Sequence, residues 1–208
     1  KCNTEILGYF TTVLHDLSVG EIIQMEKAEE LDTTMEDYYK IIECKTASLF
    51  MAAVKSGAIS AGAKKEDIDS LAEYAYHLGV AFQMRDDIFD YSPKMDTGKL
   101  AGADIKERKI TLPLLCAMAN APEKEAQMRH LIEGIENTVT KGEEITSSDK
   151  EIIGKITEFV NSNNGIADAQ NILEGHIAKA IAAIAALPES NAKKRLVQLA
   201  EFTGSRNS

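Results

Sequence analysis

The sequence has 208 residues, a formal net charge of −10 at pH 7 and a hydrophobic share of 44%. A chain of this length and apolar content can bury one sizeable core, and its acidic balance excludes non-specific nucleic-acid binding, which needs a basic surface. The three cysteines have no metal-like spacing, which indicates free thiols in a reducing compartment. No signal peptide is visible, and no apolar run approaches the roughly 20 residues that span a bilayer. We therefore expect a cytoplasmic protein without a membrane span.

The first helix is predicted from about Thr4 to Ala28, where apolar residues recur at the helical period. Because the chain starts at Lys1 and the helical pattern follows within a few residues, we expect a fragment or a processed form. Gly20 falls inside this helix, where glycine costs about 1 kcal/mol relative to alanine. A glycine at this position indicates close packing against a neighbouring helix.

A second helix follows, and Thr33 with Glu36 predicts the capping box that opens it. Its apolar face is interrupted by Lys45, which leaves two interpretations. The lysine stem can pack along a partly exposed surface, or its ammonium can be held in a cleft to meet an anion. In the second case, the Thr46 hydroxyl could donate to the same anion. A loop is expected over residues 56–65.

The third helix, predicted from about Glu66 to Tyr91, carries three closely spaced carboxylates, Asp86, Asp87 and Asp90. Residues four apart share a helix face, so Asp86 and Asp90 point the same way, together with Gln83. Like charges at this spacing weaken a helix unless a cation neutralises them. Carboxylate oxygens suit a hard cation, so the pattern predicts a Mg²⁺ site.

An irregular basic segment comes next, with Lys94, Lys99, Lys106, Arg108 and Lys109. Basic residues beside carboxylates suit a site where metal and phosphate meet, and a solvated surface turn has the same composition. Helices are expected to resume near residue 112 and to cover about 123–139, 148–162, 165–187 and 191–203. The four histidines are scattered singly and are expected to be surface or structural residues. No linker or repeat divides the chain, so we expect one all-α domain over residues 1–208.

Several of these residues stand in motifs that together resemble the trans-prenyltransferases, the polyprenyl diphosphate synthases of the isoprenoid-synthase fold. The segment 82–90 resembles the family's second aspartate-rich motif, FQ followed after two residues by DDxxD. A GExxQ stretch at Gly20, a Lys-Thr pair at Lys45, a GKxxGxD loop at Gly98 and a Lys-x-Thr-Leu-Pro segment at Lys109 also match. The resemblance covers essentially all 208 residues.

Two features depart from the family pattern. Many members have glycine where this chain has Arg108, and the family's first aspartate-rich motif has no counterpart in this sequence. We therefore expect the C-terminal portion of a polyprenyl synthase domain, with its N-terminal helices missing, that is inactive by itself. A non-catalytic subunit of a heteromeric prenyl diphosphate synthase is the alternative. A class I terpene cyclase is a further one, although the DDIFD sequence does not match the serine- and glutamate-containing metal motif of those enzymes.

The resemblance implies a helical bundle around a central cavity and Mg²⁺-dependent condensation of isopentenyl diphosphate with an allylic diphosphate. It implies a homodimer, whose contact uses the first helix of this chain. Metal binding is implied for Asp86, Asp87 and Asp90, with Asp86 as the direct ligand. Ionisation would depend on Lys45, Lys99 and Asp86. Contacts to the substrate diphosphate are implied for Lys45, Thr46, Gln83, Lys99 and Lys109.

Overall fold

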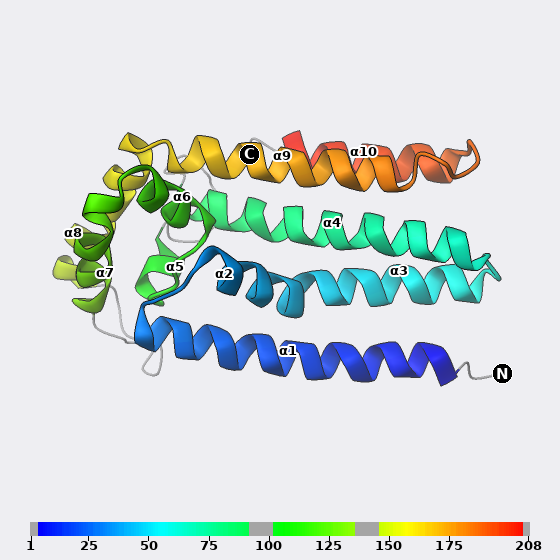
Figure 1. Cartoon of the computed structure of the whole chain (residues 1–208), viewed down its shortest axis with the longest axis horizontal. Coiled ribbons are helices and arrows are strands. Elements are labelled where there is room, and N and C mark those ends of the chain that lie inside the picture. The colour runs from blue at the N-terminus through cyan, green and yellow to red at the C-terminus, as the bar shows by residue number, and fades with distance from the viewer. Residues whose placement is uncertain (1–3, 92–101, 136–145, 206–208) are drawn as a thin grey trace. The chain divides into compact units, whose positions relative to one another are not determined.

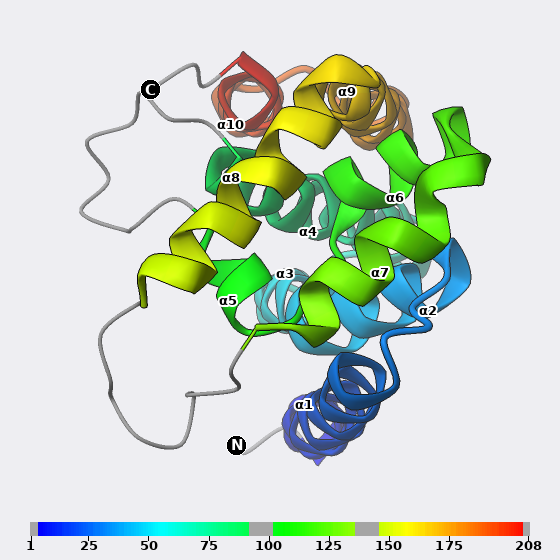
Figure 2. The same ribbon diagram turned by 90° about the vertical axis from the view of Figure 1, so that its left-hand side faces the viewer.

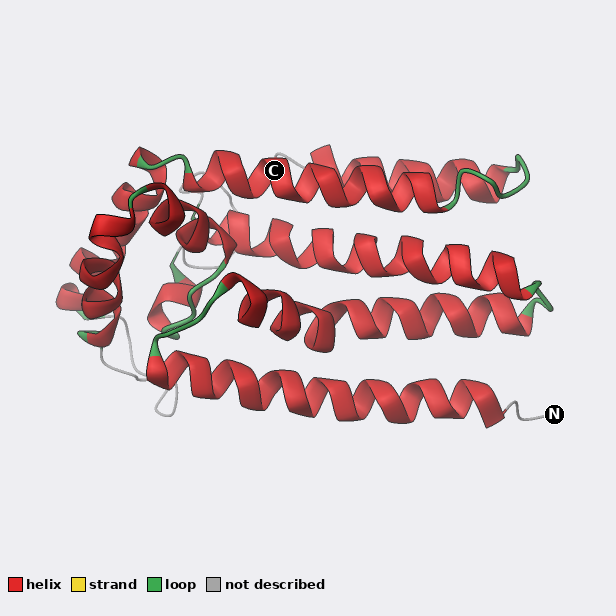
Figure 3. Ribbon diagram, viewed as in Figure 1, coloured by secondary structure: helices red, strands yellow, loops and turns green. Residues whose placement is uncertain are grey.

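The structure is a computed structural model that describes residues 4–91, 102–135 and 146–205. Every regular element in these ranges is a helix, which confirms the all-α fold class (Figure 3). The chain forms two compact units built from interleaved segments. Unit 1 contains residues 1–22, 39–85 and 172–207, and unit 2 contains residues 23–38, 86–171 and 208. The single domain over 1–208 stays a prediction.

Unit 1 is built from long helices that lie side by side (Figure 1). Helix α4 is the most buried of them, because Tyr74, Ala75 and Met84 are each at most 1% exposed. The Tyr74 hydroxyl donates to the carbonyl of Leu196 at 2.8 Å, which joins α4 to α10. The elements that contribute to this unit are α1 (Thr4–Glu30), α2 (Met35–Ile42), the π-helix η1 (Glu43–Ala47), α3 (Ser48–Ser60), α4 (Lys65–Asp90), α9 (Gly165–Ala183) and α10 (Asn191–Ser205).

Unit 2 gathers short helices around α8 (Figure 2). They include α5 (Ala103–Lys106), α6 (Leu112–Asn120), the 3₁₀-helix η2 (Pro122–Lys124), α7 (Glu125–Glu133) and α8 (Ser147–Ser162). Helix α8 begins with a capping box in which Thr146 and Asp149 bond each other's backbone N–H groups. Helix α6 is buried from Leu112 to Met118 and forms the core of this unit.

The predicted helices up to α4 are confirmed in approximate position, with three corrections of detail. The capping box lies one residue later than expected: Thr34 N donates to Asp37 at 2.9 Å, and Asp37 N donates to Thr34 at 3.1 Å. The expected loop over 56–65 is mostly helical, because α3 continues to Ser60. The second helix is also not uniform, since a π-helical turn at 43–47 separates α2 from α3.

By length and composition, helix α1 could cross a membrane. This corrects the expectation that no apolar segment is long enough to do so. It is the one such helix among the described residues, and only 11% of its apolar window is buried. A core helix of a soluble protein and a signal sequence satisfy the same test, so this finding is weak support for a span. Three exposed apolar residues of α1, Leu7, Phe10 and Leu14, recur at the helical period.

Candidate functional site

The π-helical turn η1 carries Lys45 and Thr46 at the point where α1 comes closest to it. Gly20 makes this approach possible, because a Cβ on that residue would lie 2.7 Å from Lys45 Cγ and 2.8 Å from Cys44 Cβ. Gly20 is therefore packed closely against η1, as the sequence indicated. The Lys45 ammonium forms an ion pair with Glu21 of α1 at 2.5 Å, and its side chain is 26% exposed. The GE and Lys-Thr motifs are thus in direct contact, and Lys45 is a partly exposed cation held by a carboxylate.

A polar contact and an aromatic contact join η1 and α3 to α4. The Thr46 hydroxyl donates to Gln83 Oε1 at 2.8 Å. One turn further along α3, the Phe50 ring lies 5.5 Å from the ring of Phe82, which is 48% exposed. Unit 1 therefore presents a cation, a hydroxyl–amide pair and an exposed aromatic ring on residues from two of the motifs, the Lys-Thr pair and the FQ that precedes the aspartates.

Unit 2 holds the three aspartates at the end of α4, and each has a different environment. Asp86 is exposed, and Asp87 is buried and accepts a hydrogen bond from the Tyr38 hydroxyl at 2.6 Å. Asp90 accepts the backbone N–H groups of Ala103 and Asp104 at 3.0 and 3.1 Å. Asp86 is accordingly the one of the three that is most accessible to a ligand in solution.

The carboxylates of unit 2 lie close enough to repel one another. Burial, together with the negative charges of Asp104 and Asp86, raises the pKa of Asp90 to about 6, although the backbone N–H groups of Asp104 and Ala103 act in the opposite direction. Burial also raises the pKa of Asp104, where Lys109 acts in the opposite direction. Such a cluster favours a bound cation. Asp104 was not among the predicted metal residues, although its place in the GKxxGxD motif was the signal that could have identified it.

Gly102 and Asp90 fix the described part of that motif, residues 102–104. Gly102 has φ +83°, and a Cβ there would overlap Ile153 Cγ2. Its N–H donates to the carbonyl of Asp90 at 3.0 Å. Because a side chain would be strained by the backbone and would clash, the motif requires glycine at this point.

Lys109 and Arg108 point to different partners. The Lys109 ammonium forms an ion pair with Glu107 and lies 3.5 Å from Asp104. Burial lowers the pKa of Lys109, but these two carboxylates outweigh that effect and raise it. Arg108 has φ +57°, the left-handed region that favours glycine, and its guanidinium donates to the carbonyls of Glu133 and Ile135 at 2.9 and 2.6 Å. Lys99 lies outside the described residues.

The donor set in unit 2 fits Mg²⁺ as a partial site. Among residues 4–91, 102–135 and 146–205, no three histidine, cysteine, aspartate or glutamate side chains are gathered in a way that could hold a metal. Mg²⁺ commonly takes one or two carboxylates and completes its shell with waters and substrate phosphates. The exposed Asp86 in a cluster of mutually repelling carboxylates suits that kind of coordination.

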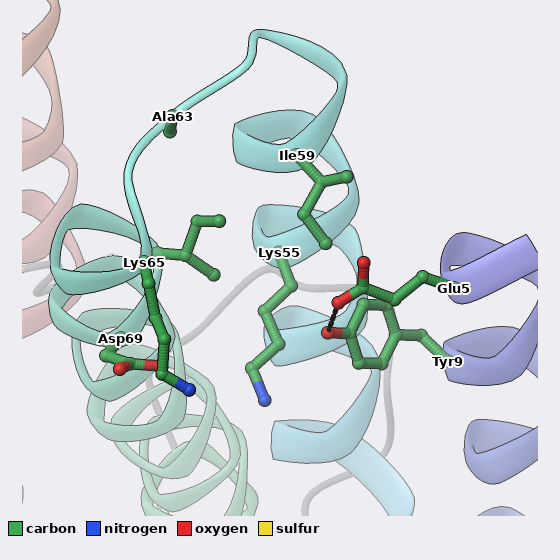
Figure 4. A pocket seen from close by; sticks show the side chains of 8 residues that line it. Glu5, Tyr9, Lys55, Ile59, Ala63, Lys65 and Asp69 are labelled. Atoms are coloured by element: carbon green, nitrogen blue, oxygen red, sulfur yellow. Dashed lines mark hydrogen bonds between the residues drawn. The ribbon is translucent and has the colours of Figure 1, made fainter. Parts of the chain in front are cut away.

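A cavity of about 540 Å³ lies among α1, α3 and the start of α4 in unit 1, and no sequence motif predicted it (Figure 4). The Tyr9 hydroxyl donates to Glu5 at 3.0 Å, and the Lys55 ammonium lies 5.4 Å from the centre of the Tyr9 ring. Lys65 and Asp69 complete its charged residues, so its acidic and basic groups balance. This balance gives the cavity no preference for a charged ligand.

The described residues thus define an all-α protein in which the GE and Lys-Thr motifs are in contact and aspartates gather at the end of α4. The family model described as polyprenyl synthetase matches residues 1–148, and the chain belongs to this family.

Relatives and solved structures agree with this membership. The octaprenyl diphosphate synthase of Escherichia coli is 31% identical over 204 residues, which cover 98% of this chain and 60% of that protein. The all-trans-nonaprenyl-diphosphate synthase of Rhodobacter capsulatus is 36% identical, with 95% of this chain and 57% of that protein covered. A polyprenyl synthase structure from Caulobacter crescentus, in complex with calcium and isoprenyl diphosphate, is similar with a TM-score of 0.83 and 31% identity, covering 99% of this chain and 60% of that one. The chain thus spans about 60% of the length of these relatives.

Proposed function

We propose that this chain contributes to a prenyl diphosphate synthase, which condenses isopentenyl diphosphate with an allylic diphosphate. The observation that carries the proposal is the family membership together with the retained motif residues, above all the three aspartates at 86, 87 and 90. Carboxylates that repel one another suit a chain that binds a cation, which supports a catalytic role over a non-catalytic subunit. The Escherichia coli and Rhodobacter capsulatus relatives are diphosphate synthases, so they give no support to a terpene cyclase.

Asp86, Asp87 and Asp90 are the proposed metal residues, with Asp86 as the direct ligand and the other two acting through waters. The burial of the three residues supports this division, because Asp86 is exposed, whereas Asp87 is buried and Asp90 is half-buried. Bound Mg²⁺ would supply Lewis-acid neutralisation of the diphosphate charge. The calcium and isoprenyl diphosphate in the Caulobacter crescentus structure support a divalent cation and a prenyl diphosphate as ligands of the family.

Contacts to the allylic diphosphate are proposed for Lys45, Thr46, Gln83, Lys99 and Lys109. Loss of diphosphate leaves negative charge on the departing oxygens, and fixed ammonium groups stabilise that charge. In this proposal, Lys45 exchanges its contact with Glu21 for one with a phosphate oxygen. Lys109 likewise exchanges its contact with Glu107 for one with a phosphate oxygen. Lys45, Lys99 and Asp86 then carry the ionisation step.

The hydrocarbon part of the substrate needs an apolar wall that excludes water, since water would quench the allylic cation. The exposed ring of Phe82 is proposed to form part of that wall, because it precedes Gln83 in the chain and packs against the tilted ring of Phe50. A homodimer is also proposed, and the exposed apolar residues Leu7, Phe10 and Leu14 on α1 support such a contact. The cytoplasmic location remains a prediction.

The test is an Asp86→Ala substitution in the full-length protein, assayed with labelled isopentenyl diphosphate, an allylic diphosphate and Mg²⁺. We expect condensation to fall by at least about a hundredfold, in line with the loss of a group that stabilises transition-state charge. Asp69→Ala, an exposed aspartate near the other end of α4, is the matched control and should retain activity. Activity of the Asp86→Ala variant within a few-fold of the unmodified protein would refute the metal assignment.

A further inference from the structure

Two histidines that are far apart in the sequence lie together in unit 1. His77 of α4 and His176 of α9 approach with their Nδ1 atoms 3.0 Å apart and their ring centres 5.1 Å apart. His176 is buried, and His77 is half-buried. These two histidines are far apart in the sequence, and the helices bring their side chains into contact across 99 residues.

We propose that His77 and His176 form a binding site for one divalent transition-metal ion of the kind that imidazole nitrogen prefers, such as Ni²⁺ or Cu²⁺. This site would be chemically distinct from the carboxylates at 86–90. Imidazole suits Ni²⁺, Cu²⁺ and Zn²⁺, whereas Mg²⁺ takes oxygen ligands.

The separation of the two nitrogens decides which geometry fits. With metal–nitrogen distances of about 2.05 Å, two neighbouring ligands at 90° lie about 2.9 Å apart, and two ligands of a tetrahedral site lie about 3.3 Å apart. The observed 3.0 Å is nearer the first value. The two nitrogens therefore already lie at about the spacing of adjacent ligands of a tetragonal or octahedral ion, a spacing that the rings must keep as they turn toward it. Water would fill the remaining positions.

Binding replaces the hydrogen bond between the rings by two metal–nitrogen bonds. The histidine that donates through Nδ1 must pass that proton to its own Nε2, and both rings must turn so that their Nδ1 lone pairs meet at the ion. For His176, the resulting Nε2–H has an acceptor, because the Tyr39 hydroxyl lies 3.3 Å from that nitrogen. A ligating histidine usually donates its other N–H to such a partner, which fixes its tautomer. No net proton is released when both rings are neutral.

The surroundings keep both rings in the neutral form that binds metal. Burial lowers the pKa of His176 to about 4, helped by His77 and Lys179. Burial also lowers the pKa of His77, as does Lys179, whereas Glu73 acts in the opposite direction. Above the usual histidine pKa of about 6.5, the neutral form of both rings therefore predominates and can bind a metal ion. Glu73 favours a bound cation and Lys179 disfavours it. Substituting either residue should therefore change the metal affinity of the site.

The experiment is a calorimetric titration of Ni²⁺ into the metal-free protein, in a Cys2→Ser background and with excess Mg²⁺ to saturate carboxylates. We expect one bound Ni²⁺, and His77→Gln and His176→Gln should each weaken binding at least about tenfold, or 1.4 kcal/mol. The two exposed histidines provide matched controls: His15→Gln and His130→Gln, whose side chains are 75% and 83% exposed, should leave it unchanged. Lys179→Gln should tighten binding, and Glu73→Gln should weaken it, each by roughly two- to fivefold.

A second measurement needs no variant at the site, in case a glutamine at position 176 prevents folding. Paramagnetic Ni²⁺ should broaden the imidazole NMR signals of His77 and His176 at substoichiometric amounts, before those of His15 and His130. Broadening confined to the two exposed histidines would overturn the proposal. Equal Ni²⁺ affinity in folded His77→Gln protein would overturn it as well.

Discussion

The Thr46 hydroxyl donates a hydrogen bond to the side-chain oxygen of Gln83 at 2.8 Å, across 37 residues of sequence. This bond fixes the amide of Gln83, whose NH₂ group can then serve as a donor to an anion. Two residues that the motifs supply separately thus behave as one polar unit.

We predict that Thr46→Val lowers kcat/KM for the allylic diphosphate by about tenfold, equivalent to 1.4 kcal/mol, because Gln83 loses its fixed orientation. Thr46→Ser keeps the hydroxyl and should retain most of the activity. Thermal unfolding of both variants should differ from the unmodified protein by only about 1 kcal/mol. Steady-state kinetics of the full-length protein checks this, and wild-type kcat/KM in Thr46→Val would contradict it.

Tyr38→Phe is predicted to destabilise the fold by about 1–3 kcal/mol, because the buried Asp87 carboxylate loses its hydroxyl donor. Tyr9→Phe removes a hydroxyl that bonds an exposed Glu5 and should change the free energy of unfolding by less than about 0.5 kcal/mol. Urea denaturation of the two variants gives the comparison. Equal stability losses would show that the buried hydrogen bond to Asp87 contributes no more to stability than the exposed one to Glu5.

Gly20→Ala should destabilise the protein by about 1–3 kcal/mol, since its Cβ would overlap Lys45 and Cys44. Gly8→Ala lies on the same helix with nothing within 4 Å of the added Cβ. It should be neutral or stabilise by up to about 1 kcal/mol, because alanine is the better helix former. Melting temperatures of the pair distinguish the packing role of Gly20 from helix propensity, and a harmless Gly20→Ala would rule that role out.

The stability of the metal-free protein should fall as the pH drops from about 6.5 to 4. The unfolded chain binds a proton at His176 in this range, whereas the folded protein, where burial lowers the pKa of His176 to about 4, does not. Stability therefore rises with pH in this window, by about 2–3 kcal/mol for this one group. His176→Gln should flatten the profile measured by urea unfolding at several pH values, and the exposed His130→Gln should not. A profile that His176→Gln leaves as steep as before would contradict the assignment.

Arg108→Gly is predicted to destabilise the protein by about 1 kcal/mol, even though its φ of +57° favours glycine. Glycine would relieve roughly 1–2 kcal/mol of backbone cost, and the lost guanidinium bonds to the carbonyls of Glu133 and Ile135 are worth somewhat more. Arg108→Ala loses the guanidinium bonds and also keeps the backbone cost of a positive φ. It should therefore be the less stable of the two variants. Calorimetric unfolding of both proteins tests the order, and a gain in stability for Arg108→Gly would mean that the backbone cost outweighs the guanidinium bonds.

The helices could be predicted from the sequence because apolar residues repeat at the helical period and glycines mark close contacts. Contacts across long sequence separations could not, which is why the pairing of His77 with His176 and of Tyr38 with Asp87 was missed. The carboxylates of the DDxxD motif were recognisable together, yet their different surroundings depend on partners such as Asp104 and Ala103 that only the fold supplies. The roles of these residues in binding metal and diphosphate stay predictions.

The π-helical turn at Glu43–Ala47 also affects how this segment tolerates changes in length. A π-helix holds one residue more than the α-helical ladder needs. Deleting one residue there would restore a regular α-helix and leave α2 and α3 in register with each other, while the side chains of the turn itself would take new directions about the helix axis. The ammonium of Lys45 would then lose its place beside Glu21, although helix content would hardly change. A circular-dichroism spectrum would not distinguish such a variant from the unmodified protein. A ligand-binding measurement would be needed to detect the displaced Lys45.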